Sequence, residues 1–92
     1  MAEDSAVTVV IRFDHHHFIP QKIEIPSGKP ILLTVVNVGN ERIEFESFKL
    51  HREKVIEPGH TVVIHLPALR PGNYDFFDDF HEDVPEGVMI AR

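Results

Sequence analysis

Turn-forming segments interrupt this chain of 92 residues so often that only short elements fit between them. The clearest are Pro26-Ser27-Gly28-Lys29-Pro30, Gly39-Asn40, Pro58-Gly59 and Pro71-Gly72. The stretches between them are rich in β-branched and aromatic residues, and none keeps a helical period for about 11 residues. Strands separated by a turn about every 8–12 residues are typical of an all-β sandwich, so we expect about six to eight short strands.

The apolar pattern indicates how individual strands are buried. Ile31–Val38 is a nearly continuous apolar run, which we expect to be a central strand buried on both faces. The next stretch, Arg42–Phe48, alternates, with Ile43 and Phe45 on the predicted inner side. Residues 49–54 carry four charged residues and a histidine, and are expected to be a surface excursion between strands.

Composition narrows the classes of function. Fifteen acidic residues against nine Lys and Arg give a formal net charge of −6, which argues against a nucleic-acid partner and suits a cationic ligand. The chain has no cysteine, so disulfides and thiolate chemistry are excluded. No apolar run approaches the about 20 residues of a membrane span, so no direct membrane insertion is expected. Residues 1–92 are expected to form a single domain.

Three blocks of the sequence together resemble the cupredoxins. They are Pro20…Ile23-x-Ile25-Pro26-Ser27-Gly28-Lys29-Pro30, then Val35-x-Asn37, then Leu69-x-Pro71-Gly72-x-Tyr74-x-Phe76. The resemblance extends over almost the whole chain and implies a Greek-key β-sandwich of the cupredoxin type. In such sandwiches a Tyr after a Pro-Gly turn hydrogen-bonds back to the turn backbone, and Tyr74 is expected to do so.

The same resemblance places the four ligand positions of a blue-copper protein. The His, Cys, His and Met of that site fall at Ile43, Asp78, His81 and Val84, so only His81 is retained. Because a type 1 copper site requires a thiolate, the sequence excludes blue-copper electron transfer.

A narrower resemblance is to the small cupredoxin-like subunit of bacterial ferrous-iron uptake systems. It is carried by Glu44-Phe45-Glu46-Ser47, Leu50-x-Arg52-Glu53-Lys54-Val55-Ile56 and Phe76-Phe77-Asp78-Asp79-Phe80-His81. The resemblance implies a periplasmic or exported protein that binds iron or copper and oxidises Fe(II) as a ferroxidase. It also implies two partners, a periplasmic iron-binding protein and a membrane permease.

Asp78 and His81 are the first candidate metal ligands. They lie three residues apart on a predicted loop, a spacing with which the parent fold aims two side chains at one metal. Carboxylate with imidazole suits iron, manganese or copper. The alternative is that Asp78 and the acids after it form a solvated loop.

Two glutamates on one strand are the next candidates. Glu44 and Glu46 flank Phe45 and therefore share a face. Glu44 is expected either to complete the metal site or to be a plain surface residue. For Glu46 the alternative to metal binding is an ion pair with Arg52 or Lys54.

The run His15-His16-His17 follows the first predicted strand and so reaches the same pole of the fold as the Asp78–His81 loop. One of the three could complete the site; we expect His16, although an adventitious copper or zinc site formed by the run itself stays open. The other histidines, among them His51, His60 and His65, are expected on the surface.

These expectations give one functional hypothesis and one alternative. The first is a periplasmic metal-binding protein of an iron-uptake system, with a Cu or Fe ion as cofactor. The alternative is a metal-free cupredoxin-like interaction domain that has lost its copper site. The segment Met1–Ala6 fits equally an exported protein whose signal peptide is missing and a native cytosolic start.

Overall fold

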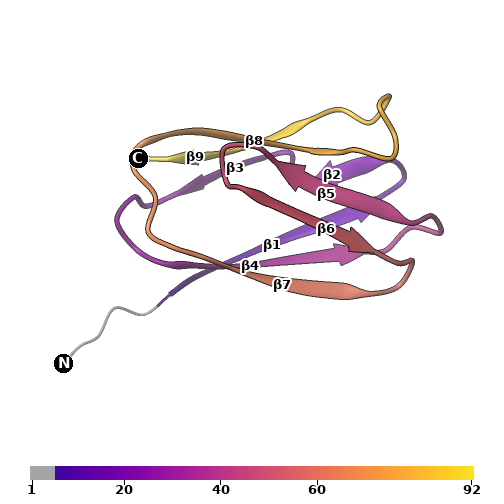
Figure 1. Cartoon of the computed structure of the whole chain (residues 1–92), viewed down its shortest axis with the longest axis horizontal. Helices are drawn as coiled ribbons and strands as arrows, with labels where there is room; N and C mark the ends of the chain where they lie inside the picture. Colours follow the sequence, from indigo (N-terminus) through magenta and orange to yellow (C-terminus); the bar gives the residue numbers. More distant parts are fainter. Residues whose placement is uncertain (1–5) are drawn as a thin grey trace.

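Nine strands and no helix make up residues 6–92, the part of the chain that the structure, a computed structural model, describes (Figure 1). The alternatives for the start of the chain depend on residues that lie largely outside this range. In chain order the strands are β1 (Val7–Asp14), β2 (His17–Ile19), β3 (Lys22–Ile25), β4 (Ile31–Asn37), β5 (Ile43–Ser47), β6 (Arg52–Ile56), β7 (Thr61–Leu66), β8 (Gly72–Asp78) and β9 (Gly87–Ala91). Within residues 6–92 no helix is long and apolar enough to cross a membrane.

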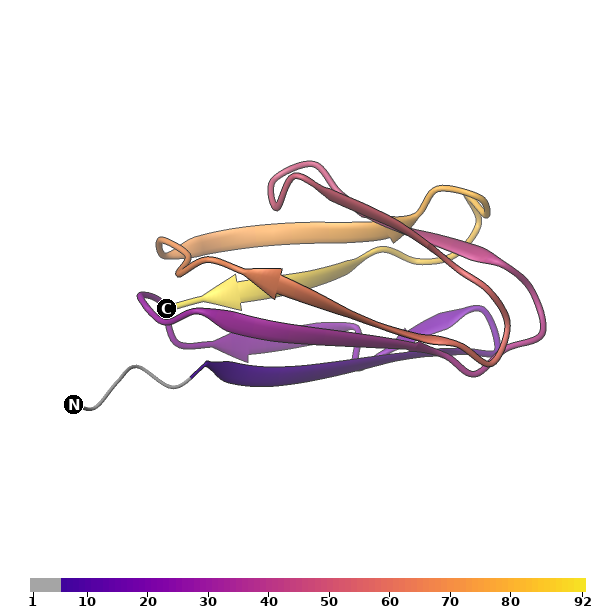
Figure 2. The same cartoon turned by 60° about the horizontal axis from the view of Figure 1, so that its bottom comes forward.

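The strands form two sheets stacked as a sandwich (Figure 2). One sheet has the order β2-β1-β4-β7 and the other the order β3-β9-β8-β5-β6. Strand β1 runs parallel to β4, and β3 runs parallel to β9, whereas the remaining pairs are antiparallel. The all-β sandwich predicted from the sequence is therefore confirmed.

Aromatic side chains fill the core next to the site described below. Phe76 lies two residues before the end of β8, and its ring centroid is 5.1 Å from that of Phe18 and 5.2 Å from that of Phe45. All three rings are fully buried. Because protein cores are close-packed, this cluster fixes β2, β5 and the last part of β8 relative to one another.

Four connections meet at one end of the sandwich, on the right in Figures 1 and 2 and opposite the C-terminus. They are the β1–β2 turn, the β4–β5 connection, the β6–β7 turn and the β8–β9 loop, and we call this region the loop end. Buried Asn37 ties two of them together, since its Nδ2 donates to the carbonyls of Glu41 (2.7 Å) and Ile56 (3.0 Å). Its Oδ1 accepts from the backbone N–H of Gly39 at 3.1 Å.

The structure also corrects details of the expected strands. Nine strands are present in residues 6–92 instead of about six to eight. His17–Ile19 pairs with β1, and the last three residues of the expected surface excursion begin strand β6, which pairs with β5. Strand β4 alternates between buried and half-buried residues and is not buried on both faces. The expected Tyr74 contact is confirmed: its hydroxyl donates to the carbonyl of Arg70 at 2.8 Å.

Candidate metal centre

Asp78 lies at the end of β8 with only 2% of its surface exposed, which corrects its predicted place on a loop and also the alternative of a solvated loop for this residue. Its Oδ1 accepts hydrogen bonds from the backbone N–H groups of Glu44 and Phe80, both at 3.0 Å. Its Oδ2 accepts from Nδ1 of His81 at 2.6 Å. A buried carboxylate is stable only when it is hydrogen-bonded, and these contacts satisfy both oxygens.

His81 lies on the β8–β9 loop with a side chain that is 25% exposed. While Nδ1 faces Asp78, Nε2 lies 3.1 Å from Oε1 of Glu41. The hydrogen bond to Asp78 is the main cause of a raised pKa of His81, and the charges of Asp78, Glu41 and Asp83 raise that pKa further, against a smaller opposing effect of burial. Both ring nitrogens of His81 thus face carboxylate oxygens.

The residues that the sequence resemblance aligns with the four blue-copper ligands do not fit a type 1 copper ion. Ile43 is fully buried and Val84 is 5% exposed, and neither side chain can coordinate a metal. Asp78 and His81, which take the Cys and His positions, are hydrogen-bonded directly to each other. With no sulfur ligand in the chain, the site lacks the donors that define this class of copper centre.

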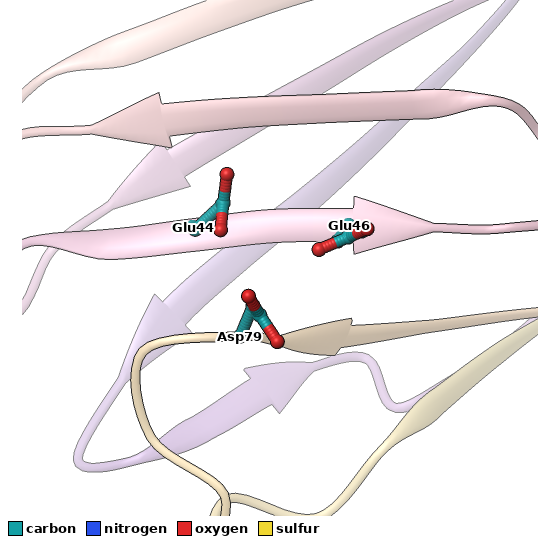
Figure 3. A group of neighbouring side chains, drawn as sticks. All are labelled: Glu44, Glu46 and Asp79. Atoms are coloured by element: carbon teal, nitrogen blue, oxygen red, sulfur yellow. The ribbon is translucent and has the colours of Figure 1, made fainter.

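A second group of carboxylates lies on the outer face of the five-stranded sheet (Figure 3). Glu44 and Glu46 project from β5, and Asp79 follows the last residue of β8. Each offers one carboxylate oxygen within 4.8 Å of the others, so we call these residues the carboxylate triad. The backbone holds it in place, because the N–H of Asp79 donates to the carbonyl of Glu44 at 2.9 Å.

Partial burial, together with the negative charges of the triad and of its neighbour Glu53, raises the pKa of two triad members. The pKa of Glu44 is raised by partial burial and then by the charges of Glu53, Glu46 and Asp79. Partial burial, Asp79 and Glu53 likewise raise the pKa of Glu46. Glu53 adds to the repulsion because it lies opposite Glu46 in the β5–β6 register. A cation between the triad oxygens would relieve this repulsion.

The histidine run forms the turn between β1 and β2. His15 and His16 both have positive φ, 52° and 63°, which suits a two-residue hairpin turn. This conformation is uncommon for non-glycine residues, although His, like Asn and Asp, adopts it more often than most. This turn places the ring of His16 edge-on to that of His81, with centroids 6.1 Å apart. His15 instead lies beside Asp14, and His17 interacts with the carbonyl of His15.

The predicted site residues therefore fall into two groups. Asp78, His81 and His16 meet at the loop end, whereas Glu44 and Glu46 belong to the carboxylate triad. The ion pairs found within residues 6–92 do not include Glu46, and the Arg52 guanidinium donates to backbone carbonyls instead. The remaining histidines singled out for the surface, His51, His60 and His65, are exposed as expected.

Sequence reasoning missed two members of these groups. Asp79 stands inside the block Phe76–His81, but the pattern did not show that its side chain would face β5. Glu41 follows the Gly39-Asn40 turn, and only the folded β4–β5 connection brings it to His81. The signal for Asp79 was present in the sequence as the paired acids Asp78-Asp79.

Comparisons with known proteins assign the chain to a family. The model of the cupredoxin-like domain matches residues 1–91, and the chain belongs to that family. Protein RP394 of Rickettsia prowazekii (strain Madrid E), itself uncharacterized, is 39% identical over 89 residues, which cover 97% of this chain and 71% of that protein.

Solved structures agree on the fold. Reduced auracyanin from the photosynthetic bacterium Roseiflexus castenholzii superposes with a TM-score of 0.77 at 15% identity, covering 96% of this chain and 98% of that one. A purple cupredoxin from Nitrosopumilus maritimus gives a TM-score of 0.72 at 16% identity, covering 91% and 99%. The likeness at these identities concerns the backbone scaffold alone.

Proposed function

We propose that this chain is an exported metal-binding protein of an iron-uptake system, and that it holds Fe(II), or copper, at the carboxylate triad. The observation that carries the proposal is the convergence of Glu44, Glu46 and Asp79 to within 4.8 Å with no basic side chain paired to any of them among the ion pairs of residues 6–92. Oxygen ligands are those that hard cations prefer. The net charge of −6 supports the attraction of a cation to this face.

Oxidation of Fe(II) is the finer part of this proposal. Carboxylate oxygens stabilise Fe(III) more than Fe(II), because the interaction grows with the charge of the ion, so binding at the triad would lower the reduction potential of iron. Each Fe(II) ion loses one electron to become Fe(III), and dioxygen is the electron acceptor in the experiment described below. The product would then pass to a periplasmic iron-binding protein or a membrane permease.

Binding is tested with Mn(II), an air-stable probe for a hard divalent cation. The free Mn(II) signal in electron paramagnetic resonance should fall on addition of wild-type protein, and affinity should drop by about tenfold or more in Glu46→Gln and in Asp79→Asn. Glu24→Gln is the matched control, because this exposed glutamate of the same sheet pairs with Arg92 at 3.3 Å. Equal Mn(II) affinity in wild type and both triad variants would reject the triad as the site.

The oxidation step needs its own measurement. Formation of Fe(III) from Fe(II) in air should be faster with wild-type protein than with Glu46→Gln or without protein. If Mn(II) binds at the triad but Fe(II) oxidation proceeds at the protein-free rate, the protein carries the ion without oxidising it.

One observation favours the second candidate, a metal-free interaction domain. Asp78 and His81 are hydrogen-bonded to each other, and Ile43 and Val84, the other two residues that the resemblance aligns with copper ligands, are buried and have no ligand atom. This candidate predicts no saturable binding of any divalent cation at physiological ionic strength, an outcome that the Mn(II) titration distinguishes directly.

A further inference from the structure

We propose a second metal site at the loop end, formed by Nε2 of His81, the imidazole of His16 and the carboxylate of Glu41. Two imidazoles and one carboxylate suit a borderline divalent ion such as Cu(II) or Zn(II), and three protein ligands leave a position open for water or a further ligand. Asp78 is not a ligand in this site but positions His81. The proposal does not depend on metal binding at the carboxylate triad, which shares no residue with it.

The orientation of His81 is the first step of the argument. Because the carboxylate of Asp78 can only accept, Nδ1 of His81 donates and Nε2 is directed toward Glu41, 3.1 Å away. A carboxylate on the far nitrogen is the usual way in which proteins fix the tautomer and ring plane of a metal-binding histidine. Here that carboxylate is buried and held by two backbone N–H groups, so the ring is presented by a rigid support.

The second ligand, Glu41, is also positioned by the fold. Asn37 is fully buried and donates to the backbone carbonyl of Glu41 at 2.7 Å, which anchors the β4–β5 connection. The neighbouring Arg42 is paired with Glu57 at 3.0 Å, and the ion pair of Glu41 within residues 6–92 is the one with His81. A divalent cation between Oε1 of Glu41 and Nε2 of His81 would take the place of the Nε2 proton.

The third ligand comes from the strained β1–β2 turn. His16 adopts a φ of 63°, which is uncommon for non-glycine residues although less so for His than for most. No hydrogen bond of its ring is found within residues 6–92. Unfavourable backbone conformations persist where the surrounding structure or the function requires them. The turn brings the centroid of the His16 ring to 6.1 Å from that of the His81 ring. His16 and Glu41 line one cavity of about 400 Å³ that opens to solvent, and His81 lies outside its lining. Within residues 6–92 only the carboxylate triad brings three such ligand atoms to within 4.8 Å of one another, so binding at the loop end requires the exposed His16 ring to turn toward His81.

Copper is the probe for this site, used with the full chain. Titration with Cu(II), followed by calorimetry, should give one tight equivalent in the wild type. His81→Asn, His16→Asn and Glu41→Gln should each weaken this equivalent by about tenfold or more. Electron paramagnetic resonance should show nitrogen couplings from two imidazoles in the wild type and from one in His16→Asn.

Two controls separate this site from other modes of binding. His15→Asn removes an adjacent histidine that faces Asp14, and Glu46→Gln removes a member of the carboxylate triad; both should leave the tight equivalent intact. Equal losses in His15→Asn and His16→Asn would show adventitious binding by the histidine run and overturn the proposal. If only Glu46→Gln lost the tight Cu(II) equivalent, the loop-end site would be rejected in favour of the carboxylate triad. Weak Mn(II) binding at the triad would not count against the loop-end site, because the two sites share no residue.

The positioning role of Asp78 has a spectroscopic test. In Asp78→Asn the amide Oδ1 can still accept from the backbone, while its NH₂ group would donate to Nδ1 of His81 and move the imidazole proton to Nε2. Nitrogen NMR shifts of His81 should report this change of tautomer, and Cu(II) affinity should fall by about tenfold or more although the fold is retained. Unchanged affinity with a changed tautomer would show that Nε2 of His81 is not a ligand.

Discussion

Asp78 carries a carboxylate inside the sandwich, and its three hydrogen bonds close the junction of β5, β8 and the β8–β9 loop. Asp78→Ala removes the acceptor and leaves the N–H groups of Glu44 and Phe80 unpaired in a part-buried place. The free energy of unfolding should therefore fall by about 2–4 kcal/mol, as measured by urea denaturation. Asp78→Asn keeps an acceptor oxygen, so its free energy of unfolding should fall clearly less than that of Asp78→Ala. Equal losses in the two variants would mean that the side chain contributes through its packing alone.

The carboxylate triad should oppose folding at neutral pH. The raised pKa of Glu46 means that the folded protein holds this proton more tightly than the unfolded chain. The resulting contribution to stability is full below the ordinary carboxyl pKa and is lost as the pH rises through the raised value. Glu46→Gln should therefore increase the melting temperature at pH 7 but not near pH 3, where the carboxyls are protonated in both states. A lower melting temperature for Glu46→Gln at pH 7 would contradict this balance.

At the scale of elements, the β1–β2 turn is the place where backbone strain can be tested. A two-residue hairpin turn with positive φ at both positions is most stable as Asn-Gly, and here the two positions are His15 and His16. The double variant His15→Asn/His16→Gly should raise the free energy of unfolding by about 1–2 kcal/mol in urea. The same variant should lose the Cu(II) equivalent at the loop end. His17→Asn, just outside the turn, is the control and should change stability little.

The elements that the sequence predicted best are those whose signal is local. The alternation of Arg42–Phe48 and the Pro-Gly-x-Tyr corner each specify their own structure, and both are confirmed in β5 and at Tyr74. Strand β6 was missed because it is an edge strand, where charged side chains are common. The three-residue β2 was missed because its pairing with β1 comes from the turn and not from its own composition.

The candidate site was predictable in the same uneven way. His81 and Asp78 come from one short block of sequence, so their spacing alone suggested that they act together. The spacing could not show that the two side chains contact each other. Asp78, which was expected to be a metal ligand, is buried and accepts a hydrogen bond from Nδ1 of His81. Glu41 reaches His81 only because the β4–β5 connection and the β8–β9 loop lie side by side, and Asp79 reaches the two glutamates only because β8 lies beside β5. Contacts between segments so far apart in the chain cannot be deduced from a single sequence.

At the scale of the whole molecule, the chain has the cupredoxin-like fold, and the sequence resemblance aligns Ile43, Asp78, His81 and Val84 with the four blue-copper ligands. The backbone superposes on auracyanin with a TM-score of 0.77. Ile43, Asp78 and Val84 are all buried, and the N–H groups of Glu44 and Phe80 point at the side chain that stands in the thiolate position. A thiolate there would accept the same two hydrogen bonds. On this alignment, the chain differs from a blue-copper protein at three of the four ligand positions.

The triple variant Ile43→His, Asp78→Cys, Val84→Met should therefore bind Cu(II) with an intense visible absorption, because it places two imidazoles, a thiolate and a thioether around one point. Replacing fully buried Ile43 by His should cost about 1–3 kcal/mol in the metal-free protein, since the imidazole gains no assured partner. Copper binding to the folded state would offset part of that loss, so the melting temperature should rise with added Cu(II). Asp78→Cys alone is the control: it supplies the thiolate without the second imidazole and should give no stable colour. A triple variant that folds and binds copper but stays colourless would show that these four residues do not occupy the copper positions, and the placement of Asp78 as successor to the thiolate would be wrong.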